Sequence, residues 1–126
     1  MGEEKLVNSI RYLVNKIIKE NGPLNLFMLL KDQDNLETFT VIISSKWLDV
    51  MNAFDGTKII TKYLYDNLST DEIIMLSRIN AINTLDYQVL FINQLFELTG
   101  GITDIENCRF NMVNIPKAII FESLSI

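Results

Sequence analysis

The sequence predicts an α+β fold, with a mixed or mainly antiparallel sheet of about five strands and helices packed on it. Apolar residues recur at spacings of three and four along several segments, which is typical of amphipathic helices. Other segments are rich in Val, Ile, Thr and Phe and predict two hairpins plus one strand. Because strands do not alternate strictly with helices, a sheet with helices on one face is favoured over a doubly wound parallel sheet.

The first half of the chain predicts a long helix, a hairpin and two further helical pieces. The long helix runs from Glu3 to Asn21 and ends before a Gly-Pro pair, which cannot continue it. The hairpin has strands at 24–31 and 36–44 around the polar turn Asp32-Gln33-Asp34-Asn35. The apolar stripe that follows changes face near Gly56, so we expect a break between two helices there.

The second half predicts two more helices with a strand between them. Ser69 and Glu72 match a capping box, in which each side chain bonds the backbone N–H of the other residue, so a short helix starts there. Residues 78–83 predict a short strand. Asp86 is placed to cap a helix that runs to about Leu98. Because this helix is apolar over a wide face, we expect it to be buried on most sides.

A second hairpin, with strands at 102–110 and 115–123, ends the chain, and no linker-like stretch divides it. The chain has 126 residues, 48% of them hydrophobic and 21% charged, which is typical of a single compact domain, 1–126, with a packed core. No apolar segment reaches the roughly 18–20 residues of a membrane span, and the first residues are acidic rather than basic. We therefore expect neither a membrane span nor a signal peptide.

The composition excludes several classes of chemistry. The chain has no histidine, so mechanisms that use a histidine base or a histidine-ligated zinc within the chain are excluded. Cys108 is the only cysteine, which excludes an internal disulfide and favours a reducing cytoplasm. A buried, inert thiol is favoured over a nucleophile activated by Arg109. The net charge of −5 disfavours nucleic acid as a partner.

Three carboxylates crowd around the first hairpin turn. Asp32, Asp34 and Glu37 are candidate ligands for Mg²⁺ or Ca²⁺, because these cations prefer carboxylate oxygens. The pattern lacks the Gly and the terminal Glu of a calcium loop, and Phe39 stands where an acid-acid-lysine nuclease core needs Lys. A solvated turn is therefore favoured, with a divalent cation as the alternative and no other cofactor predicted.

Three other residues are candidates for binding a ligand. Trp47 and Asp49 lie at the start of a predicted helix, where an indole can stack on a flat ligand or serve as a packing anchor. Arg78 lies among apolar residues and needs a carboxylate partner if it is buried. A structural ion pair with Asp49 or Asp71 is favoured over a clamp for a phosphate or substrate.

Three stretches of the sequence resemble a family of small uncharacterised prokaryotic proteins. They are Ile43-Ser44-Ser45-Lys46-Trp47-Leu48-Asp49, Leu76-Ser77-Arg78-Ile79 and Asn107-Cys108-Arg109-Phe110-Asn111. The resemblance covers about the last two-thirds of the chain. It implies a prokaryotic cytosolic protein and carries over no functional residue.

Two hypotheses of function follow from these patterns. The first is a non-enzymatic interaction module, either a homodimer or the small subunit of a prokaryotic assembly, because the usual catalytic residue types are missing and apolar surface is abundant. We expect part of that surface on the first helix. The second is a small enzyme or ligand-binding domain that uses carboxylates, Arg78 and a divalent cation.

Overall fold

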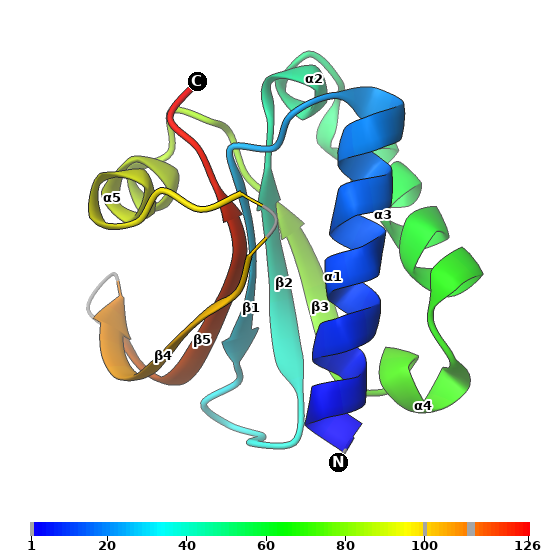
Figure 1. The fold of residues 1–126 in the computed structure, drawn as a ribbon, viewed down its shortest axis with the longest axis vertical. Coiled ribbons are helices and arrows are strands. Elements are labelled where there is room, and N and C mark those ends of the chain that lie inside the picture. Colours follow the sequence, from blue (N-terminus) through cyan, green and yellow to red (C-terminus); the bar gives the residue numbers. More distant parts are fainter. Residues whose placement is uncertain (1, 100, 111–112) are drawn as a thin grey trace.

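The computed structural model describes the backbone of residues 2–99, 101–110 and 113–126, and the side chains of the same residues except 107–115. Its centre is one five-stranded sheet with the strand order β3-β2-β1-β5-β4 (Figure 1). The neighbours β2 and β3 are parallel, and the other three pairs are antiparallel. The predicted α+β fold with a mixed, mostly antiparallel sheet is confirmed.

The two predicted hairpins supply four of the five strands. The first joins β1 (Leu26–Lys31) to β2 (Phe39–Ser44), and the second joins β4 (Thr103–Phe110) to β5 (Val113–Ser123). The first turn is longer than predicted, since residues 36–38 belong to it rather than to a strand. The predicted strand around 78–83 is β3 (Leu76–Ala81), which lies at one edge of the sheet.

Helix α1 (Gly2–Asn21) packs along one face of the sheet, with Leu6, Ile10, Leu13, Val14 and Ile17 buried. Its apolar stripe meets Phe27 of β1 and Phe121 of β5 in the larger of two cores. The backbone turns away after α1 at Gly22, whose φ of 113° is a conformation that side-chain-bearing residues rarely adopt. The sheet covers the apolar stripe of α1, so the apolar surface that we expected on this helix is reduced to exposed side chains such as Tyr12.

The same face carries α2 (Lys46–Asp49), α3 (Ala53–Asn67) and α4 (Thr70–Ile73). The break between α2 and α3 lies at residues 50–52. Our prediction of a break near Gly56 was therefore wrong. Asn52 caps α3, because its side-chain oxygen accepts a hydrogen bond from the Asp55 N–H at 2.8 Å. Gly56 lies within α3, beside the Leu48 side chain. The capping box of Ser69 and Glu72 at the start of α4 is confirmed.

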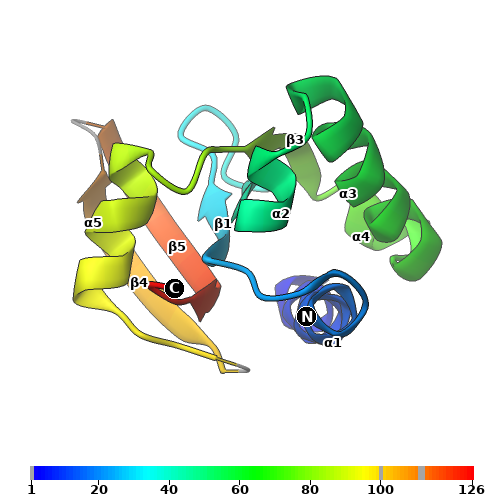
Figure 2. The same cartoon turned by 90° about the horizontal axis from the view of Figure 1, so that it is seen from above.

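Helix α5 (Tyr87–Leu95) packs on the opposite face of the sheet from α1 and α3 (Figure 2). The prediction of helices on one face was therefore wrong. The sheet supports a second, smaller core here, made by Leu26, Met28, Ile42, Val89, Ile92 and Ile120. Asp86 caps α5 as predicted, but the helix ends at Leu95 because Leu98 pairs with Ser123 as an isolated bridge to the sheet.

None of the helices in the described ranges has the length and apolar character that a membrane crossing requires.

Candidate functional site

Three of the predicted site residues lie around one hollow on the face of the sheet that carries α5. The hollow has a volume of about 420 Å³, and we call it the Arg78 hollow. Its lining includes Asp32 and Asp34 from the first turn, Arg78 from β3, and Gln88 from α5. The predicted residues Trp47 and Asp49 are not part of it.

The floor of the Arg78 hollow follows from the register of three strands. Thr40 of β2 pairs with Leu30 of β1 on one side and with Arg78 of β3 on the other. In the next row, Ile42 pairs with Asn80. The β1 side of this floor is therefore apolar and the β3 side is polar. Because β3 is an edge strand, Arg78 is exposed and not buried.

Asp32 is held at the end of this floor by hydroxyl groups. Its Oδ2 accepts a hydrogen bond from Thr38 Oγ1 at 2.5 Å, and its Oδ1 accepts one from Thr40 Oγ1 at 2.7 Å. Burial opposes ionisation of this carboxyl group, but hydrogen bonds from Ser77, Thr38 and Thr40, together with the charge of Arg78, outweigh it and lower the pKa of Asp32. Asp32 is therefore an ionised structural group that orders the turn.

We expect Asp32→Asn to lower the free energy of unfolding by about 1–3 kcal/mol at pH 7, because it removes charge-assisted hydrogen bonds from a buried group. The pKa of Asp32 is lowered in the folded state, so this contribution is complete above the unfolded value of about 3.9 and is lost as the pH falls through the folded value. Urea denaturation of the wild type and the variant at pH 7 and in acid measures the difference, which should narrow below about pH 4.

Asp34→Asn is the control, because Asp34 is exposed in the same turn. It should change stability by less than about 0.5 kcal/mol at either pH. A gap between Asp32→Asn and the wild type that stays constant into acid would contradict the assigned role of the Asp32 carboxylate.

The three carboxylates of the first turn differ in their surroundings. Asp34 and Glu37 are exposed, and both oxygens of Asp32 accept bonds from threonine hydroxyls. In the described part of the chain, no group of three or more Asp, Glu or Cys side chains is placed to hold a metal ion. The divalent-cation site stays a prediction.

Trp47 and Asp49 lie near the other end of the sheet. Trp47 is half-buried against the larger core, beside Gly22. Asp49 accepts hydrogen bonds from the Thr84 backbone N–H and from Thr84 Oγ1, the latter at 2.6 Å. These bonds fix the segment that leads from β3 to α5. Among the described residues, Arg78 forms no ion pair with Asp49 or Asp71, so the predicted pairing is not observed.

The side chains of Cys108 and Arg109 lie outside the described residues, so the prediction of a buried, inert thiol remains a prediction.

Helix α5 exposes a group of large apolar side chains. Leu85, just before the helix, is 79% exposed, and within it Tyr87 is 66%, Leu90 49% and Leu95 58% exposed. We call these four residues the α5 surface. The prediction that this helix is buried on most sides was wrong, because only Val89 and Ile92 are fully buried against the sheet and Phe91 is partly covered.

The α5 surface lies beside a second hollow and on a firmly anchored helix. The hollow, of about 430 Å³, is lined by Tyr87, Leu90, Phe91, Asn93, Gln94 and Ser125. The Asn93 side chain donates hydrogen bonds to the Asn25 carbonyl at 2.9 Å and to Ser123 Oγ at 2.8 Å. These bonds, together with the buried stripe, fix which side of α5 faces outward.

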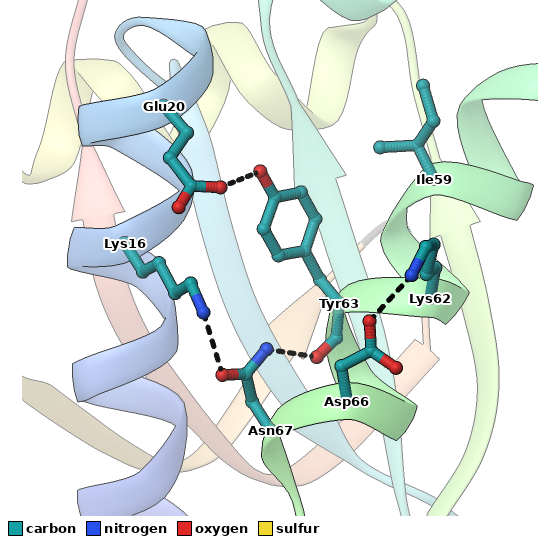
Figure 3. A pocket seen from close by; sticks show the side chains of 7 residues that line it. All are labelled: Lys16, Glu20, Ile59, Lys62, Tyr63, Asp66 and Asn67. Atoms are coloured by element: carbon teal, nitrogen blue, oxygen red, sulfur yellow. Dashed lines mark hydrogen bonds and ion pairs between the residues drawn. The ribbon is translucent and has the colours of Figure 1, made fainter.

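A third hollow, of about 320 Å³, lies between α1 and α3 (Figure 3). Tyr63 from α3 forms its centre, donating a hydrogen bond to Glu20 Oε1 at 2.6 Å and accepting one from Asn21 Nδ2 at 2.7 Å. The bond to the Glu20 carboxylate, and to a smaller extent burial, raises the pKa of Tyr63. The phenol is therefore a neutral group that ties the two helices together, and it is poorly suited to act as a base.

Sequence reasoning did not identify this groove between α1 and α3. Its one local signal is the pair of Lys62 and Asp66, four residues apart on α3 and 2.8 Å from each other. The contacts that shape the groove, Tyr63 with Glu20 and Lys16 with Asn67, join residues more than 40 positions apart. Both signs of charge line it and offset each other, so it has no marked preference for an anion or a cation.

Comparison with known proteins adds no relative: no family model, no curated protein and no solved structure matches the chain.

Proposed function

We propose that the protein is a non-enzymatic interaction module that self-associates through the α5 surface. The observation that carries this proposal is a nine-residue helix without a charged residue, from which Tyr87, Leu90 and Leu95 project into solvent. The single cysteine suits a reducing compartment, so we place the module in the cytoplasm. The acidic net charge argues against nucleic acid as its partner.

The apolar character of α5 supports an interface. A helix that is apolar around most of its circumference is normally buried on most sides, whereas here only Val89 and Ile92 of this helix are fully buried, with Phe91 partly covered. Single exposed apolar residues are ordinary on protein surfaces, but exposed apolar side chains that gather beside one hollow, as Tyr87 and Leu90 do, are typical of a contact with another molecule. The α5 surface adds an aromatic element, since the rings of Tyr87 and Phe91 stack at 5.9 Å.

Charge and shape favour a second copy of this chain as the occupant. Two copies with a net charge of −5 each repel one another, but two uncharged α5 helices can meet without placing like charges in contact. The α5 surface also combines projecting leucines with the hollow beside Tyr87 and Phe91. A patch with both a projection and a recess can complement itself across a two-fold axis.

The test compares two substitutions to lysine at equally exposed leucines. Leu95→Lys, at the end of α5, should weaken self-association at least about tenfold, because it places an unpaired ammonium group in the apolar contact. The substitution makes the net charge less negative, so general repulsion between copies cannot explain the loss. Sedimentation velocity over a concentration series measures the association constant of each variant.

Leu36→Lys is the matched control, since Leu36 is 57% exposed, against 58% for Leu95, and lies in the first hairpin turn. It should associate like the wild type. A wild type that remains monomeric into the millimolar range, or a Leu36→Lys variant that dissociates as readily as Leu95→Lys, would overturn the proposal.

A further inference from the structure

We infer that the Arg78 hollow binds a small zwitterion with the groups of a free amino acid, an ammonium and a carboxylate. This inference does not depend on self-association, because it rests on a different part of the α5 side of the sheet. It requires a cation and a carboxylate that remain available, a floor between them, and room for the ligand.

Four charged residues line the hollow, and two of them are already engaged. The ammonium group of Lys31 pairs with Glu3 at 3.2 Å, and the Asp32 carboxylate accepts bonds from Thr38 and Thr40. The other two are Arg78 and Asp34. In the described part of the chain, neither of these side chains forms a hydrogen bond or an ion pair, and both are exposed to solvent. The lining therefore offers one available charge of each sign.

The strand order separates these two charges. Arg78 belongs to β3 and Asp34 follows the end of β1, with β2 between them. Neighbouring strands lie about 4.8 Å apart, so β1 and β3 are about 10 Å apart, and Asp34 lies in the turn beyond the end of β1. Side chains that lean inward from both sides can reach a ligand placed over β2. The floor of the Arg78 hollow over β2 consists of Thr40 and Ile42, with Leu30 of β1 beside them.

The charges of the lining select for a zwitterion over simpler ions. A plain anion would meet Arg78 but also the carboxylates of Asp32 and Asp34, whereas a plain cation would meet the like charge of Arg78. A carboxylate on Arg78 with an ammonium group toward Asp34 satisfies both sides, and a guanidinium can bind a carboxylate through two parallel hydrogen bonds.

Size and neutral polar groups agree with a ligand of this class. The hollow of about 420 Å³ lies in the range of small-molecule sites and exceeds the volume of a single amino acid. The amides of Asn80 and Gln88 are at its edge and can bond the ligand without adding charge. An aliphatic side chain on the ligand would contact Leu30 and Ile42.

The test is an amide NMR titration of the protein with the twenty free amino acids, followed through the backbone signals of Asn80 and Gln88. L-leucine serves as the reference ligand because the floor is apolar, and we expect saturable shifts at up to about 10 mM. N-acetyl-L-leucine, which lacks the ammonium group, and L-leucinamide, which lacks the carboxylate, should each bind at least about tenfold more weakly.

Two variants test whether Arg78 and Asp34 bind the two charged groups of the ligand. Arg78→Gln and Asp34→Asn should each weaken binding of L-leucine at least about tenfold, while the exposed controls Lys58→Gln and Glu4→Gln should bind it like the wild type. The Leu95→Lys variant should also bind it normally, which separates this inference from the proposed function. The inference is overturned if no amino acid gives saturable shifts, or if the blocked leucines bind as well as free L-leucine.

Discussion

Phe27→Ala should lower the free energy of unfolding by about 3–5 kcal/mol, the largest effect that we expect from a single substitution. Phe27 is fully buried on β1, where the sheet meets α1. Its ring packs edge to face with Phe121 of β5, at a centroid distance of 6.0 Å and an interplanar angle of 89°. Truncation removes this contact and leaves a cavity between two strands and a helix that cannot collapse freely.

Urea denaturation at low protein concentration measures this effect, and Phe54→Ala is the matched control. Phe54 is 75% exposed at the start of α3, so its truncation should change stability by less than about 0.5 kcal/mol. The double variant with Phe121→Ala should reveal a coupling of about 0.5–1.5 kcal/mol between the two rings. A loss below about 1 kcal/mol for Phe27→Ala would contradict the central place of Phe27 in the core.

The elements that the sequence predicted well depend on neighbours along the chain. Helix α1 and both hairpins follow from apolar periodicity and turn residues, which act within a few positions. The capping box of Ser69 and Glu72 is equally local. The break before α3 was also readable, because Asn52 and Asp55 have the spacing of a helix cap, but the Asp55-Gly56 pair gave a competing turn signal.

The features that could not be predicted depend on the order of strands in the sheet. The exposure of Arg78 follows from the position of β3 at an edge, and no pattern within β3 reports that position. The placement of α5 opposite α1 is set by the crossover from β3, and its exposure by how little of it the sheet can cover. Its apolar composition was compatible with burial in the domain or in an interface between copies.

The candidate site, like the fold, was only partly predictable from the sequence. The sequence drew attention to Asp32 and Asp34 as one cluster and to Arg78 apart from them, and only the pairing of β2 with both β1 and β3 brings all three to one hollow. Trp47 and Asp49 stood out for the same kind of reason, yet they lie at a different place, where Trp47 packs on the larger core and Asp49 accepts hydrogen bonds from Thr84. Residue type alone therefore identified candidate site residues but could not show which of them share a site.

Ile92→Ala should lower the free energy of unfolding by about 2–5 kcal/mol, the second large effect that we expect. Ile92 is buried between α5 and the sheet, where it packs with Met28, Ile42 and Ile120 in the smaller core. Leu95, three residues later on the same helix, faces solvent, so Leu95→Lys should leave the stability of the isolated chain within about 0.5 kcal/mol of the wild type. Urea denaturation at a protein concentration well below the dissociation constant for self-association measures both free energies of unfolding.

Comparing the two variants separates the two sides of α5. If the inner side holds the helix on the sheet and the outer side serves another molecule, Ile92→Ala reduces stability, whereas Leu95→Lys reduces only self-association. An equal loss of stability in both variants would mean that Leu95 is packed within the chain and that α5 has no outward apolar side. The α5 surface would then lose the exposure on which the proposed interface depends.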